Sequence, residues 1–212
     1  MSTIFNEQDF ENFDTRFRTN FFNSIVGFRA LHLVGTQNAK NQTNLAAFSS
    51  IFHMGSNPAY FGMLFRPSDD VPRHTLANIL ETGFYTFNHI NQSNFKKAHQ
   101  TSAKYSSEIS EFETCGFEEY YLPNFFAPFV KEANVQVGLQ FVEKHEMSFN
   151  KTTLVVGKVI MTSVSESYIG TDGFIDVLQA GSMASVGIDG YAFVDKFTRM
   201  SYAKVGQTAS EI

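Results

Sequence analysis

Five side chains between residues 44 and 78 have the chemistry that binding a phosphate monoester requires. They are hydroxyl and guanidinium groups: Ser49, Ser50, Arg66, Arg73 and Thr75. A phosphate monoester is held by several donors at once, including hydroxyls, guanidinium groups and the free N–H groups of a helix start. We therefore predict an anion-binding corner in this segment. The alternative is that Pro72 only starts a helix, that Thr75 completes its first turn and that both arginines are solvated.

The elements around these side chains are expected to bring them together. Residues 45–54 and 59–65 are strand-like, and Gly55-Ser56-Asn57-Pro58 between them is typical of a tight turn. A polar run follows at 67–71, and Pro72 then opens a helical pattern that ends at Gly83. If the two strands pair through the turn, their open ends lie side by side, next to the helix start.

Patterning elsewhere predicts further strands and helices. Strands are expected at 25–35, 84–90, 135–142 and 152–164, the last two joined as a hairpin by a polar turn at 144–151. The spacing of Phe10, Phe13 and Phe17 predicts a short N-terminal helix or surface arm, and residues 92–104 predict another helix.

Residues 106–116 are expected to form a loop or short helix that ends at glycine, Asp172-Gly173 a turn, and 181–190 an irregular segment. Short strands with interspersed helices, and no regular βαβ alternation, favour an antiparallel barrel with helices at its ends. We expect one domain, with an N-terminal arm or helix at 1–23, a core at 24–191 and a C-terminal extension at 192–212.

Composition excludes several function classes. The chain has 212 residues, 43% of them apolar and 17% charged, which is typical of a folded domain. A net charge of −5 without a basic cluster argues against nucleic-acid binding. The polar, acidic N-terminus is not a signal peptide, and no apolar run approaches the length of a membrane span, so we expect a cytoplasmic protein. A single cysteine, Cys115, excludes an intramolecular disulfide.

Other polar residues have two interpretations. The amides of Asn44 and Asn78 suit the pyrimidine edge of a ring system or a chain hydroxyl, but they are equally consistent with a turn position and an exposed helix position. The six histidines show no metal-ligand spacing, so no metal site is predicted. Glutamates near Cys115 are expected to raise its pKa and make the thiol unreactive. The chain has no G-x-S-x-G, P-loop or G-x-G-x-x-G pattern, and a hydrolase with a dispersed Ser-His-Asp set lacks any local support.

The chain resembles the flavin reductase-like, FMN-binding split-barrel family in several segments that occur in the right order. They are Asn44-Leu45-Ala46-Ala47-Phe48-Ser49, Ser56-Asn57-Pro58, His74-Thr75-Leu76-Ala77-Asn78-Ile79, Glu81-Thr82-Gly83-Phe84, Thr101-Ser102-Ala103-Lys104-Tyr105, Glu111-Phe112-Glu113 with Gly116, Leu154-Val155-Val156-Gly157-Lys158-Val159 and Asp172-Gly173. The similarity covers residues 24–191. The sequence differs from the family pattern in two places. The proline often found at the position of Ala47 is absent, and residues 181–191 match the family's C-terminal glycine-rich segment only loosely.

The resemblance implies an antiparallel Greek-key split β-barrel with added helices, a homodimer, and FMN (FAD being possible) near the subunit interface. By the same resemblance, the residues that line the flavin, its chain and its phosphate would be Asn44, Ala46, Ser49, Ser50, Arg66, Arg73, Thr75, Asn78, Ala98, Thr101 and Ser102.

The implied activity is hydride transfer from NAD(P)H to flavin, for which no catalytic acid or base is predicted. Reduced flavin or electrons would pass to an oxygenase or another acceptor. The alternative on the same fold is a non-catalytic FMN-binding electron carrier, sensor or store.

Overall fold

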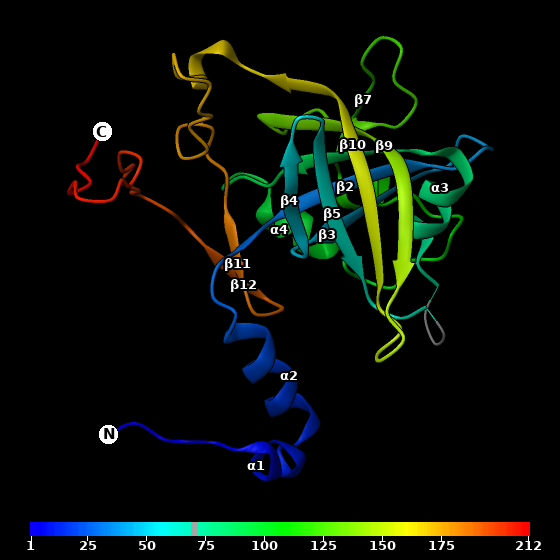
Figure 1. Cartoon of the computed structure of the whole chain (residues 1–212). Helices are drawn as coiled ribbons and strands as arrows, with labels where there is room; N and C mark the ends of the chain where they lie inside the picture. The colour runs from blue at the N-terminus through cyan, green and yellow to red at the C-terminus, as the bar shows by residue number, and fades with distance from the viewer. Residues whose placement is uncertain (69–71) are drawn as a thin grey trace.

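A seven-stranded antiparallel sheet forms the body of the molecule (Figure 1). The computed structural model describes residues 1–68 and 72–212, so residues 69–71 of the predicted polar run lie outside the described part. The strands of this sheet are β2 (His32–Gln37), β3 (Thr43–Phe48), β4 (Ile51–Ser56), β5 (Ala59–Phe65), β6 (Phe84–His89), β9 (Val135–Glu146) and β10 (Thr153–Val164).

The order of the strands, β3-β2-β6-β9-β10-β5-β4, puts two strands that are consecutive in the chain at opposite edges of the sheet. Only Ser49 and Ser50 separate β3 from β4. The sheet therefore curls until its edge strands β3 and β4 approach each other at this corner. These two strands are not paired with each other, so the barrel is not closed. This arrangement confirms the predicted antiparallel Greek-key split β-barrel.

Strand β2 is buried on both faces, because the barrel has an inner and an outer core. Successive side chains of a strand point to opposite faces. Val34 belongs to the inner cluster with Met63 and Phe87, whereas Leu33 belongs to the outer cluster with Phe112. The outer cluster includes residues of two short helices, α4 (Phe95–Gln100) and α5 (Glu111–Cys115).

The helix predicted after Pro72 is α3 (His74–Thr82), and it ends at Gly83 in the left-handed conformation, with φ 79°. Helix α4 is shorter than the predicted 92–104. The Asn91 side-chain oxygen accepts hydrogen bonds from the Ser93 N–H and hydroxyl, which holds the preceding residues in a turn. Such local bonds offer the backbone an alternative to the helix.

The N-terminal segment forms two helices, α1 (Glu7–Asn12) and α2 (Thr15–Ser24), which project from the barrel as an arm (Figure 1). The break between them falls at Asp14, whose carboxylate accepts from the N–H groups of Arg16 and Phe17 and so caps α2. The predicted strand at 25–35 starts late, as β1 (Arg29–Ala30) followed by β2.

The predicted hairpin at 135–164 is confirmed, with β9 extending further than expected. The single strand predicted at 45–54 is wrong, because the chain bends at Ser49 and Ser50 between β3 and β4. Part of the segment predicted as irregular forms a strand: β11 (Ala184–Val186) lies between β1 and β12 (Gly190–Ala192) in a small antiparallel sheet. The other short elements are β7 (Glu119–Tyr120), β8 (Phe129–Val130) and η1 (Glu166–Tyr168).

Candidate functional site

A cavity of about 750 Å³ lies at the corner where β3 passes into β4, and we call it the main cavity. Its walls come from the end of β5, the start of α3, the segment after α4 and residues 187–188. Nine of the eleven predicted binding residues line it: Asn44, Ala46, Ser49, Ser50, Arg66, Arg73, Thr75, Thr101 and Ser102. The fold therefore brings most of the predicted set together.

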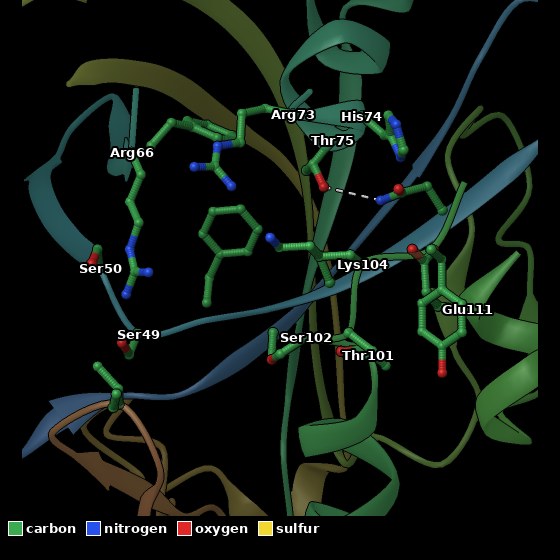
Figure 2. Close-up of a pocket in the computed structure, with 18 of the residues that line it drawn as sticks. Ser49, Ser50, Arg66, Arg73, His74, Thr75, Thr101, Ser102, Lys104 and Glu111 are labelled. Carbon is green, nitrogen blue, oxygen red and sulfur yellow. Dashed lines mark hydrogen bonds between the residues drawn. The ribbon is translucent and has the colours of Figure 1, made fainter. Parts of the chain in front are cut away.

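Pairing of β4 with β5 places the two serines beside Arg66. The Leu64 N–H donates to the Ser50 carbonyl oxygen at 3.0 Å, which fixes the open ends of the two strands side by side as predicted. In Figure 2, the Arg66 side chain extends toward Ser49 and Ser50. One end of the main cavity thus combines two hydroxyls with a guanidinium.

Two more cations point into the same space, Arg73 and Lys104 (Figure 2). The Arg73 Nε and Nη2 donate to the Pro67 carbonyl oxygen at 3.2 and 3.0 Å, so this guanidinium is held in place by the backbone. With Arg29, four positive side chains line this one hollow, which favours an anion, since guanidinium and ammonium groups form strong hydrogen bonds with phosphate.

A buried hydrogen bond joins the wall made by β3 to the wall made by α3. The Asn44 Nδ2 donates to the Thr75 Oγ1 at 3.0 Å, and both residues are less than a tenth exposed. Because the Thr75 oxygen accepts this bond, its own O–H remains available as a donor. Thr75 is therefore fixed by Asn44, which replaces the interpretation that it only completes a helical turn.

Glu111 contributes a carboxylate to the lining and supports the exposed edge of β3. Its Oε2 accepts from the Leu45 backbone N–H at 3.0 Å. Burial raises the pKa of Glu111, an effect partly countered by this hydrogen bond and by His74. In Figure 2, Glu111 lies on the far side of the view from Arg66, so the two ends of the main cavity differ in charge.

Two predicted residues do not line the main cavity. Ala98 is fully buried in the outer core, because α4 turns this side chain toward the cluster that contains Leu33 and Phe112. Asn78 is buried and its Nδ2 donates to the Thr36 Oγ1 at 3.1 Å, which fastens α3 to β2. The exposed helix position that was the alternative for Asn78 is wrong.

Several lining residues were missed at the sequence level, among them Arg29, Phe48, Phe65, His74, Lys104, Glu111, Gly187 and Ile188. Lys104 and Glu111 stand in segments that carry the family resemblance, so that signal could have found them. Arg29 and Gly187 are far apart in the chain, and the Arg29 guanidinium donates to the Gly187 carbonyl oxygen. Only the folded chain reveals that pair.

Cys115 is buried, and burial is the main reason that its pKa is raised, with Glu111 adding to the effect and a contact with the Tyr105 hydroxyl opposing it. The predicted direction of the shift is confirmed, although its main cause is burial. Within residues 1–68 and 72–212, no group of three His, Cys, Asp or Glu side chains is arranged to hold a metal ion. None of the helices in the same residues is long and apolar enough to cross a membrane.

Comparison with known families identifies the domain. Residues 29–173 match the model of the flavin reductase like domain. The chain belongs to the flavin reductase-like family. The matched residues contain both serines, all four arginines and lysines of the lining, and Thr75, whereas Gly187 and Ile188 of the lining lie beyond them.

Solved structures agree with this assignment. A candidate flavin reductase with a split barrel domain from Shewanella frigidimarina NCIMB 400 is 42% identical, with a TM-score of 0.91, covering 95% of this flavin reductase-like chain and 100% of the other. Nitrilotriacetate monooxygenase component B from Bacillus cereus is 16% identical (TM-score 0.81, covering 93% and 98%). Flavoredoxin from Methanosarcina acetivorans is 21% identical (TM-score 0.70, covering 97% and 96%). The last two proteins share the fold of this chain. A search of curated proteins found no match to the sequence.

Proposed function

We propose that this flavin reductase-like protein binds FMN in the main cavity and transfers a hydride to it from NADH or NADPH. The observation that carries the proposal is the gathering of Ser49, Ser50 and Arg66 at one end of a cavity of about 750 Å³. Ligand pockets in proteins typically measure about 300 to 1,000 Å³. The cavity is thus large enough for a mononucleotide, and its cationic end suits a phosphate.

The phosphate would be held by Arg66, Arg73 and Lys104 together with the two serine hydroxyls. A single anion-binding end favours FMN over FAD, because FAD carries a second phosphate and an adenosine that need room of their own. The amide of Asn44 and the hydroxyls of Thr101 and Ser102 would bind the polar groups of the remaining cofactor.

Bound FMN would supply the redox chemistry of the reaction. The task of the chain is then to orient the ring and to leave one face open for the nicotinamide. The Asn44–Thr75 hydrogen bond and the Glu111–Leu45 hydrogen bond fix the walls in advance, so that little side-chain ordering is needed when the cofactor enters.

We also propose that the working form is a homodimer. The arm formed by α1 and α2 projects from the barrel and exposes Phe17 and Phe22, and Phe28 follows it with 74% of its surface exposed. Thr19 and Asn23 of α2 line the main cavity, which puts the arm at its mouth. Light scattering after size exclusion would report twice the chain mass of 23.9 kDa, and a single-chain mass would contradict a dimer.

The direct test of the reductase activity mixes the purified protein with FMN and either NADH or NADPH and follows the absorbance of the reduced nicotinamide. We expect oxidation of one donor well above the rate with free FMN. A protein that takes up FMN but oxidises neither donor would be an electron carrier, sensor or store. A protein that takes up no flavin would contradict the proposal altogether. Adding an oxygenase that consumes reduced flavin would then test the class of acceptor.

A further inference from the structure

A second cavity of about 310 Å³ lies on the other side of the small sheet from the main cavity. Adjacent residues of β1 show the separation: Arg29 lines the main cavity, and Ala30 lines the second cavity. Successive side chains of a strand point to opposite faces, so the two cavities are distinct spaces that share one strand as a wall.

The walls of the second cavity are apolar and include two aromatic rings. Phe174 and Phe197 pack with their centroids 5.6 Å apart. The Arg199 guanidinium lies 4.1 Å from the Phe174 centroid and forms an ion pair with Asp172. These contacts fasten the C-terminal segment against the 172–174 turn and so hold the aromatic wall in place.

Two histidines and a serine give this apolar cavity a polar side. The rings of His32 and His89 meet edge to face, with centroids 4.7 Å apart. The His89 Nδ1 lies 2.7 Å from the Ser182 Oγ, within hydrogen-bond distance. The His32 Nδ1 is buried and has no hydrogen-bond partner within the described chain. A buried polar atom without a partner is costly, so a small rotation of the imidazole that brings this nitrogen to a ligand group in the cavity would be favourable.

Both imidazoles are uncharged at neutral pH. Burial lowers the pKa of His89 to about 4, and burial together with the nearby His89 lowers the pKa of His32. A neutral imidazole offers one donor and one acceptor nitrogen. The second cavity therefore presents hydrogen-bonding groups without a charge, which suits an uncharged ligand better than a carboxylate, a phosphate or an amine.

We propose that the second cavity binds a small uncharged aromatic molecule with one hydroxyl or carbonyl group, of the phenol or quinone class. Its ring would pack against Phe174 and Phe197, and its oxygen would hydrogen-bond to His32. A volume near the lower end of the usual range for ligand pockets sets the size at one or two fused rings. This site does not depend on FMN, since no residue of the main cavity lines it.

The test is a calorimetric titration of the full chain, saturated with FMN, with 2-naphthol as the probe and naphthalene and 2-naphthoate as comparison ligands. We expect 2-naphthol to bind at least tenfold more tightly than either of the others. The variant Ala30→Phe fills the second cavity and should weaken 2-naphthol binding at least tenfold. Ala77→Phe, an equal change at an exposed position of α3, is the control and should leave it unchanged.

A second variant tests the polar contact. His32→Phe keeps an aromatic ring but removes the unpartnered nitrogen, so the preference for 2-naphthol over naphthalene should disappear while naphthalene still binds. Thermal melts of each variant confirm that it is folded. FMN affinity should be the same in wild type, Ala30→Phe and Ala77→Phe.

Three results would overturn the proposal. They are the absence of 2-naphthol binding to the wild type, equal binding to Ala30→Phe, and displacement of FMN by the probe. If the wild type binds no probe and Ala30→Phe instead lowers the molecular mass measured by light scattering, the second cavity receives a segment of a second copy rather than a small molecule.

Discussion

Buried polar side chains at single positions join the walls of the main cavity. Asn44 bonds to Thr75 and Glu111 bonds to the Leu45 N–H, while Asn78, which does not line the cavity, holds α3 against β2 through Thr36. Each bond is buried, so removing one partner leaves the other unsatisfied in a medium of low polarity. The shape of the site therefore depends on a few specific hydrogen bonds.

Replacing Thr75 with valine tests this dependence. The shape is kept, but the Asn44 Nδ2 loses its acceptor, and we expect unfolding to become easier by about 1 to 3 kcal/mol, together with weaker FMN binding. Urea titration and an FMN titration measure the two effects. Thr171→Val, at an exposed loop position, is the control. Equal effects at both positions would show that the buried bond adds nothing.

The low pKa of His89 predicts how stability depends on pH. The folded protein holds this group neutral down to about pH 4, facing His32 and Ser182, whereas the unfolded chain protonates it near its ordinary pKa of 6.5. Since the unfolded state then binds more protons, stability should fall as the pH drops from about 6.5 to about 4. Melting temperatures across this window should fall less steeply for His89→Gln. An identical slope would contradict the assignment.

Among the elements, helix α3 depends on the residue that follows its last turn, Gly83, to end where it does. Gly83 has a φ of 79°, and a Cβ built there meets no atom within 4 Å. The cost of Gly83→Ala is therefore backbone strain alone, about 1 kcal/mol. Gly83→Asn should cost less, because asparagine tolerates this conformation better. Thermal melts should give the highest melting temperature for the wild type, then Gly83→Asn, then Gly83→Ala. A melting temperature of Gly83→Ala equal to that of the wild type would contradict the role of the glycine.

The same helix shows what local sequence can predict. Pro72 and Gly83 mark its ends, and both ends lie within two residues of the predicted positions. The bend between β3 and β4 has no such mark, because no Gly or Pro stands there and apolar residues flank Ser49 and Ser50 on both sides. It arises from pairing with β5, through the bond from the Leu64 N–H to Ser50. The short strand β11 was missed for the same reason, since its pairing with the distant strand β1 creates it.

In the molecule as a whole, most residues of the main cavity could be predicted from the segment 44–78 and from the family resemblance. The others reach the cavity only through the pairing of distant strands. Ala98 was assigned to the site by the family resemblance, whereas the structure buries it in the outer core. Arg29 and Gly187 reach the main cavity only because β1 pairs with β11. The pattern of apolar and polar residues along the sequence does not show which distant segments will pair, so Arg29 and Gly187 could not be predicted.

The interior of the barrel offers one further prediction. The Tyr85 ring packs over Gly157, where a Cβ would lie 1.9 Å from the hydroxyl oxygen, and that hydroxyl is buried with no partner in the described chain. Burial also raises the pKa of Tyr85. Tyr85→Phe should therefore stabilise the fold by about 1 kcal/mol, and Gly157→Ala should destabilise it strongly. A lower urea midpoint for Tyr85→Phe would reveal a partner for the hydroxyl.

In the proposed function, Arg66, beside Ser49 and Ser50, binds the phosphate of FMN. The most direct test of this role compares the affinities for FMN and for riboflavin, which lacks the phosphate, in wild type and Arg66→Ala, with Lys204→Ala in the C-terminal extension as the control. We expect Arg66→Ala to weaken FMN binding at least tenfold and to leave riboflavin binding within twofold, and we expect the control to change neither. Unchanged FMN affinity, or an equal loss for both flavins, would contradict it.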